Sequence, residues 1–89
     1  MDKNEFEAQL RADGYTEIES KTLALRPAND GHGHHYAVRG LVLAGAFTVI
    51  EGGKPTTYRP GQVFAVAAGC VHSEEVGTEG AQILVGRKY

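Results

Sequence analysis

The spacing of hydrophobic positions changes near residue 15 of the chain. Before that point Phe6 and Leu10 stand four residues apart, acidic residues come early and Gly14 is a natural stop, so one short helix is expected within residues 1–14. Beyond it, short apolar and β-branched runs are separated by turn-forming residues roughly every 8–12 positions, the spacing of an all-β sandwich or barrel. Residues 15–89 are therefore predicted to form a β-barrel.

The turn signals divide this second part into about seven to nine short strands. Glycines between Glu51 and Pro55 can take positive φ and predict a hairpin, and Gly40 predicts a bend within a longer strand. A cluster of turn-forming residues, Arg26–Gly31, closes the first extended run. The expected strand regions are residues 15–26, 32–44, 47–50, 56–59, 63–66, 71–76 and 81–86.

Length and composition favour one small globular domain that spans residues 1–89. The chain has 89 residues, of which 42% are hydrophobic and 22% are charged, which is ordinary for a folded protein. A domain of this size buries little surface, so a metal ion or a second copy of the chain is expected to add stability, and a homodimer is predicted. The net charge is −2 and the basic residues are scattered, so neither nucleic acid nor a membrane is an expected partner.

Two features of the sequence bear on its cellular location. The single cysteine, Cys70, cannot form an intramolecular disulfide, and the first ten residues lack the basic start and apolar run of a secretion signal. The longest apolar stretch, residues 41–50, is too short to span a bilayer. A reducing, cytoplasmic location is therefore expected, with Cys70 interpreted as a small turn residue.

Three of the four histidines fall in the segment Gly31–His35, directly after the turn cluster. In a strand, alternate side chains share a face with Cα atoms about 6.6 Å apart, so His32 and His34 can converge on one metal ion. His35 would point the other way and is expected at the surface. A stable site needs a further ligand, and His72, which follows a turn of small residues, is the candidate. The alternative is that the His32/His34 pair is only polar surface.

These histidines and the glycines around them resemble the two sequence motifs of the cupin superfamily. The matching positions are His32, Gly33, His34 and Gly45 for the first motif and Gly61, Gly69 and His72 for the second. Each motif alone is modest evidence, but the two occur in order and at a short separation. The resemblance implies a small single-domain, cupin 2-like protein with a double-stranded β-helix, or jelly-roll, barrel. It also implies that the three histidines bind a metal.

The chain departs from the cupin pattern at the position of the metal-binding glutamate. Val38 stands there, and looser spacing allows only Arg39; neither side chain binds a cation. The resemblance therefore implies either a three-histidine site or the recruitment of another ligand. Glu74 lies two residues after His72 and is expected to share its strand face, which makes it the candidate fourth ligand. A solvated charge beside Glu75 is the equal alternative.

A site of this kind suits a divalent transition metal, and imidazole ligands do not choose among Fe, Zn, Ni, Mn and Cu. Three protein ligands leave positions open for a small chelating metabolite, which favours a metal-dependent enzyme, either dioxygenase-like or an isomerase or lyase. The alternatives are a non-catalytic module that binds a small molecule or metal, and a protein in which the histidines are incidental. Candidate catalytic residues are Tyr36 as an acid, Arg39 as a carboxylate-binding cation, and Glu74.

Overall fold

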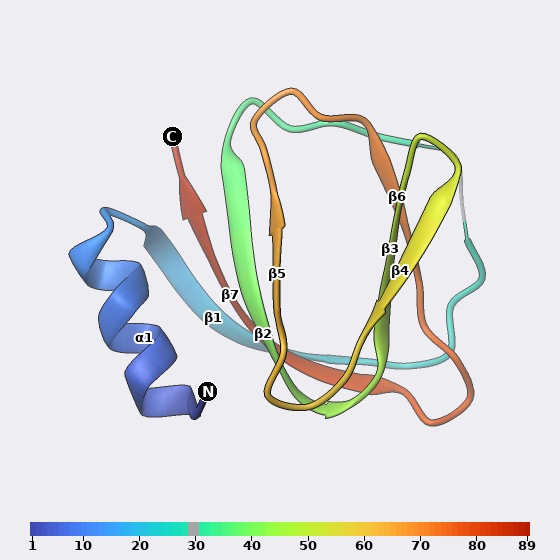
Figure 1. Ribbon diagram of the computed structural model, residues 1–89, viewed down its shortest axis with the longest axis horizontal. Helices are drawn as coiled ribbons and strands as arrows, with labels where there is room; N and C mark the ends of the chain where they lie inside the picture. The colour runs from blue at the N-terminus through green and yellow to red at the C-terminus, as the bar shows by residue number, and fades with distance from the viewer. Residues whose placement is uncertain (29–30) are drawn as a thin grey trace.

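The computed structural model describes residues 1–28 and 31–89 of the chain (Figure 1). Within these residues one short N-terminal helix is followed by seven strands, which confirms the expected all-β architecture. The helix is α1 (Lys3–Ala12). The strands are β1 (Thr16–Leu23), β2 (Ala37–Gly45), β3 (Phe47–Glu51), β4 (Lys54–Tyr58), β5 (Val63–Val66), β6 (His72–Glu75) and β7 (Ala81–Lys88).

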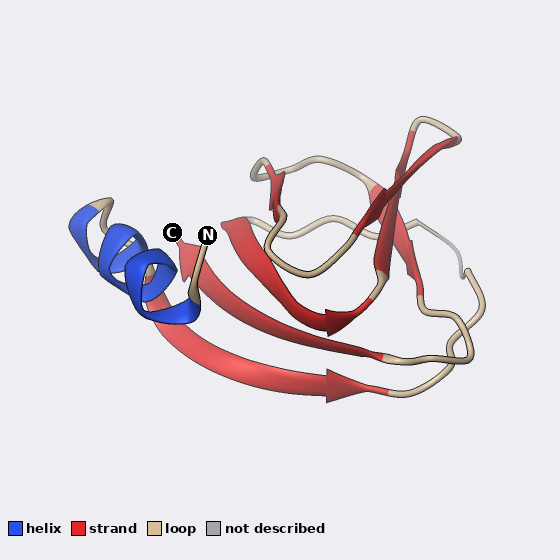
Figure 2. Ribbon diagram, turned by 60° about the horizontal axis from the view of Figure 1, so that its bottom comes forward, coloured by secondary structure: helices blue, strands red, loops and turns tan. Residues whose placement is uncertain are grey.

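The strands form two sheets that face each other (Figures 1 and 2). The larger sheet has the order β1-β7-β2-β5, and the smaller has the order β4-β3-β6. All the paired strands are antiparallel, and strands distant in sequence lie side by side, as in a jelly roll. Among the described residues no strand ladder joins an edge of one sheet to the other, so the expected barrel is in fact two facing sheets that are not closed.

Helix α1 covers the outer face of the larger sheet (Figure 2). The Asp2 carboxylate caps the helix by accepting a hydrogen bond of 2.9 Å from a first-turn backbone N–H. Phe6 and Leu10, one helical turn apart, are buried against Leu41 of β2 and Leu84 of β7. The helix therefore gives the sheet a small second core on its outer side.

The main core lies between the two sheets. Ile83 and Val85 alternate along β7 and both point inward. Phe47 of β3 and Phe64 of β5 meet across the sheets with ring centroids 4.9 Å apart. Gly40 of β2 also belongs to the inner face, and a Cβ atom there would overlap the Phe64 ring. Glycine at this position therefore makes room for an aromatic side chain of the core.

The segment before β2 differs from the prediction. Residues 32–44 were expected to form one strand, yet β2 begins at Ala37. The backbone partners of the missing part lie around the start of β6: His32 pairs with His72 in an isolated bridge, and the His34 carbonyl accepts a hydrogen bond from Gly69. Residues 32–36 are therefore an irregular segment, because no neighbouring strand of the larger sheet pairs with them.

The turns of the smaller sheet agree with the sequence. Gly52 and Gly53 connect β3 to β4 with φ values of 57° and 76°, the left-handed conformation that favours glycine in a two-residue hairpin.

Of the predicted turn cluster Arg26–Gly31, residues 29 and 30 lie outside the described residues. The rest of that cluster follows β1 and leads toward the smaller sheet (Figure 1).

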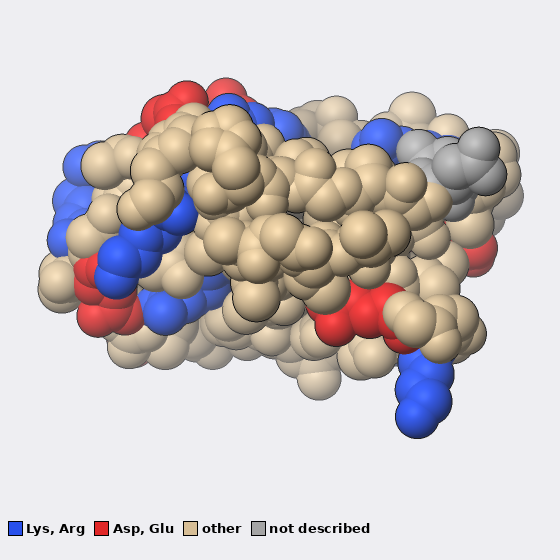
Figure 3. Space-filling model, turned by 90° about the horizontal axis from the view of Figure 1, so that it is seen from above, with Lys and Arg blue, Asp and Glu red and all other residues tan. Residues whose placement is uncertain are grey.

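The structure adds little to the expectations about location and partners. No helix in the described part of the chain is long and apolar enough to cross a membrane. Figure 3 shows Lys and Arg side chains gathered mainly toward the helix end, with acidic side chains beside them and an uncharged middle. The cytoplasmic location, the homodimer and the absence of a nucleic-acid partner stay predictions.

Candidate metal centre

The three predicted metal-binding histidines come together. His32 and His34 belong to the irregular segment before β2, and His72 begins β6. One ring nitrogen from each lies within 4.8 Å of the others. The ring centroids are 4.5 Å apart for His32 and His72, 5.0 Å for His32 and His34, and 5.5 Å for His34 and His72. In residues 1–28 and 31–89 no other three histidine, cysteine or acidic residues meet this way.

Backbone hydrogen bonds hold the two segments in register. The His32 N–H donates to the His72 carbonyl at 2.8 Å, and the His72 N–H donates back to His32 at 2.9 Å. The Gly69 N–H donates to the His34 carbonyl at 2.7 Å. The two histidines of the first segment therefore converge because of this cross-segment pairing, and the regular strand assumed from the sequence is absent. His35 is exposed, as predicted.

The ring of His72 is oriented by a hydrogen bond to the backbone. His72 is 2% exposed, and its Nδ1 lies 3.2 Å from the carbonyl oxygen of Cys70. A carbonyl oxygen only accepts, so Nδ1 carries the proton and donates it. In the neutral ring, Nε2 is then left with its lone pair free to bind a metal. Cys70 thus contributes its backbone to the site, in agreement with its interpretation as a turn residue.

The surroundings of His34 favour the neutral imidazole that metal binding requires. Burial is the main cause that lowers the pKa of His34 below its ordinary value, and the neighbouring His32 and His72 lower it further. Its ring stacks on Tyr36, with centroids 4.7 Å apart and an angle of 7° between the planes. Tyr36 lines the same cavity, which places this predicted catalytic residue beside a candidate ligand.

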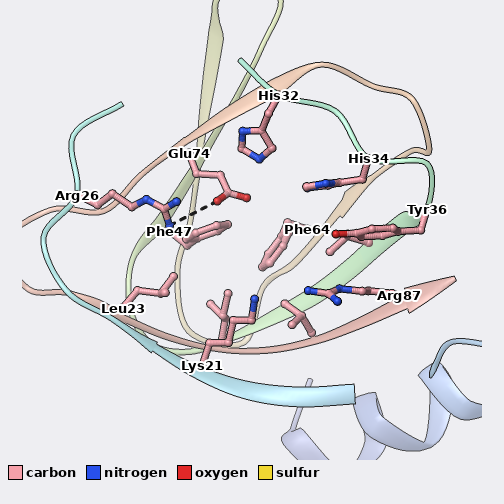
Figure 4. Close-up of a pocket in the computed structure, with 13 residues that line it drawn as sticks. Lys21, Leu23, Arg26, His32, His34, Tyr36, Phe47, Phe64, Glu74 and Arg87 are labelled. Carbon is pink, nitrogen blue, oxygen red and sulfur yellow. Dashed lines mark ion pairs between the residues drawn. The ribbon is translucent and has the colours of Figure 1, made fainter. Parts of the chain in front are cut away.

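Glu74 faces the histidines. One of its carboxylate oxygens is 3.5 Å from His72 Nε2, and the other is 3.8 Å from the Arg26 guanidinium (Figure 4). Its side chain is 22% exposed, whereas Glu75, the next residue, is exposed. Glu74 therefore points to the side that strand alternation predicted, and its role as a metal ligand stays a prediction.

Arg39 lies on the opposite face of its strand. Its guanidinium is 2.6 Å from the Asp13 carboxylate and 4.6 Å above the Tyr15 ring, beside the helix. Val38, the preceding residue, lines the cavity instead. Because adjacent residues of a strand point to opposite faces, inward Val38 forces Arg39 outward. The structure therefore does not bring Arg39 to the site, and an apolar side chain occupies the expected glutamate position.

His32 and His34 border a cavity of about 200 Å³ between the sheets. Its wall is apolar where the core residues meet it, and it carries three cations that the sequence interpretation missed: Lys21, Arg26 and Arg87. The alternation of side chains along a strand could have predicted two of these cations. Lys21 shares a face of β1 with inward Leu23, and Arg87 follows inward Val85 by two residues on β7.

No protein-family model matches the sequence, and no curated protein matches it. Solved structures do match. A predicted oxalate decarboxylase from Thermotoga maritima has a TM-score of 0.70 at 18% identity, over 90% of this chain and 71% of that one. A cupin 2 conserved barrel domain protein from Salinispora arenicola has a TM-score of 0.67 at 19% identity, over 83% and 65%. The EutQ protein of Clostridium difficile has a TM-score of 0.70 at 15% identity, over 89% and 61%.

At these identities the likeness concerns the fold. The chain has the cupin fold, as its motif resemblance implied, in a small form that spans between 61% and 71% of the length of these three proteins. The fold brings together a histidine group that could hold a metal ion. Fold alone does not identify a reaction, so the function has to be argued from the site.

Proposed function

We propose that this protein is a small metal-binding cupin in which His32, His34 and His72 hold one divalent transition-metal ion. The observation that supports this most directly is the convergence of three imidazoles, one of which already donates its other ring N–H to a backbone carbonyl. Histidine ligands of metals almost always have such a partner, which fixes the tautomer and the direction of the ring. The choice among Fe, Zn, Ni, Mn and Cu is set by availability.

Glu74 is the proposed fourth ligand. With Nδ1 of His72 donating to Cys70, the lone pair of Nε2 faces a carboxylate oxygen at a distance of 3.5 Å. Two acceptors at this distance repel each other unless a proton or a cation lies beside them. A metal ion bound by both groups removes the repulsion, and the nearby Arg26 steadies the carboxylate.

The proposed role is that of a metal-dependent enzyme that acts on a small chelating molecule. Its reaction would be dioxygenase-like, or that of an isomerase or lyase. When bound, the metal supplies a Lewis acid with positions open to the substrate. Tyr36 lines the cavity and can donate a proton from its hydroxyl. The similar Thermotoga maritima structure is a predicted oxalate decarboxylase, whose substrate is likewise a small chelating acid.

The alternative function is binding without turnover. The observation that favours it is Val38, an apolar side chain at the position where the cupin pattern has its metal-binding glutamate. A metal-loaded protein that consumes dioxygen or converts small chelating acids, and loses this activity in His72→Ala, supports the enzyme. Absence of turnover across such acids, with metal bound, supports the binding module.

Metal content tests the site itself. Purified protein is loaded separately with Fe²⁺, Zn²⁺, Ni²⁺, Mn²⁺ and Cu²⁺, dialysed, and analysed for bound metal. One equivalent of at least one metal is expected in the wild type, with loss in His32→Ala and His72→Ala. His35→Ala is the matched control, because His35 is adjacent in sequence but absent from the group. Unchanged metal content in His72→Ala would overturn the proposal.

A further inference from the structure

The cavity beside the histidines is rich in positive charge. Among the residues that the structure describes, its lining contains three cationic side chains, Lys21, Arg26 and Arg87, and one carboxylate, Glu74. Three positive groups and one negative group leave a local charge of +2 in a chain whose net charge is −2. A divalent metal would raise this excess further. Positive charge concentrated in a concave, partly apolar site attracts and holds anions.

The acidic partners of two of these cations leave them available to a ligand. Arg87 lies 3.4 Å from Glu17, and Lys21 lies 3.5 Å from Glu19. These two glutamates are about half exposed, at 48% and 52%, and neither lines the cavity. Ion pairs this exposed are weak, so they do not cancel the attraction for an anion inside. Arg26 differs, because its partner Glu74 is itself part of the lining.

The available cations lie across the cavity from His32 and Glu74. In Figure 4, His32 and Glu74 lie on one side, while Lys21 and Arg87 extend into the cavity from the other. The Arg87 guanidinium rests 5.0 Å from the centre of the Tyr36 ring, which fixes its place. Between the two ends the wall is apolar, and Phe47 and Phe64 are among the residues that line it.

We propose that the cavity binds a small organic dianion with a carboxylate at each end. One carboxylate binds the metal, and the other accepts hydrogen bonds from Lys21 and Arg87. The carbon chain between them lies against the phenylalanine rings. A volume of about 200 Å³ is smaller than the roughly 300–1,000 Å³ of sites for drug-sized ligands, which favours a ligand with few carbon atoms. The metal end of this inference rests on the proposed function.

Succinate is the probe, titrated by calorimetry into protein loaded with whichever metal it retains. Binding is expected, with an affinity about tenfold weaker in Lys21→Gln and in Arg87→Gln, because each removes a charged hydrogen-bond donor. Lys54→Gln and Arg59→Gln remove the same charge outside the lining and are expected to leave the affinity unchanged. Butyrate, which has one carboxylate, and succinamide, which has none, are expected to bind more weakly in that order. Circular dichroism establishes that each variant is folded.

The outcomes separate this inference from the proposed function. If metal binds but succinate does not, or if all four variants weaken succinate equally, the dianion site is overturned and the metal site stands. If no metal binds, the metal site fails. Titration of the metal-free protein with succinate then tests the proposed carboxylate site at Lys21 and Arg87. That site is supported only if Lys21→Gln and Arg87→Gln still weaken succinate binding while Lys54→Gln and Arg59→Gln do not.

Discussion

The two faces of the larger sheet are built from the same strands but differ in what they contact: the outer face packs against the helix, and the inner face lines the core and the cavity. On the outer face, Leu41 and Leu84 are covered by the helix and form a hydrophobic cluster with Phe6 and Leu10. On the inner face, Ile83 and Val85 belong to the main core. Arg87, two residues after Val85 on the same face, lines the charged cavity. Because successive side chains of a strand point to opposite faces, one set of side chains stabilises the fold and the other set lines the cavity.

This comparison separates substitutions that affect stability from those that affect the site. The helix contact on the outer face is a hydrophobic cluster, so its contribution to stability is mainly hydrophobic burial. The inner face combines a core with two cationic side chains, Lys21 and Arg87, that line the cavity. Variants of the outer face should therefore change the free energy of unfolding without changing ligand affinity, and variants of the cavity end should do the reverse.

Truncation of the helix contact should have the largest effect on stability. Leu10 is 0% exposed, so Leu10→Ala is expected to lower the free energy of unfolding by about 2–5 kcal/mol, through lost burial and a cavity. Urea unfolding measures the change. Gln9→Ala is the matched control, because it changes an exposed position of the same helix and should leave the free energy of unfolding nearly unchanged. Metal content in folded Leu10→Ala should equal that of the wild type.

Filling the inner face should also destabilise the protein, by overpacking. A methyl group at position 40 overlaps the Phe64 ring, so Gly40→Ala is expected to cost about 1–3 kcal/mol in the free energy of unfolding. Gly77→Ala is the matched control, because a Cβ there meets nothing within 4 Å and no left-handed φ is required. Equal stability of the two variants would contradict the close packing of Phe64 against β2.

Metal affinity at the cavity end should fall in acid. Only neutral imidazole binds a metal, so affinity is expected to decline as the pH drops below about 6.5, by about tenfold per pH unit for each ligand that must lose a proton. Because burial lowers the pKa of His34, this ligand stays neutral to a lower pH than an ordinary histidine. Metal competition titrations between pH 5 and 8 measure the decline. Undiminished affinity at pH 5 would argue against histidine ligands.

The two arginines on opposite faces give the finest test. Arg39→Gln breaks a partly exposed pair with Asp13 and should lower the free energy of unfolding by about 1 kcal/mol or less, with no effect on metal or succinate binding. Arg87→Gln should weaken succinate binding at similar stability. If Arg39→Gln weakened succinate binding as much as Arg87→Gln does, the assignment of the two residues to different faces would be wrong.

Local signals in the sequence determined most of the architecture. The helix follows from Phe6 and Leu10 one turn apart, and the β3–β4 hairpin follows from Gly52 and Gly53, since each depends on residues near one another in the chain. The same is true of Glu74, whose direction follows from strand alternation after His72. Motif spacing added the cupin fold and the three histidines, because a fixed spacing reflects a fixed set of turns.

Tertiary structure alone decided which side chains share the cavity. His32 and His34 converge through hydrogen bonds to a segment more than thirty residues away, and no local rule predicts an irregular segment there. The orientation of Arg39 depended on which face of β2 the helix covers, and the presence of Lys21 and Arg87 in one cavity depended on the pairing of β1 with β7. Alternation tells which residues share a face, but only the packing of the sheets tells which face is inside.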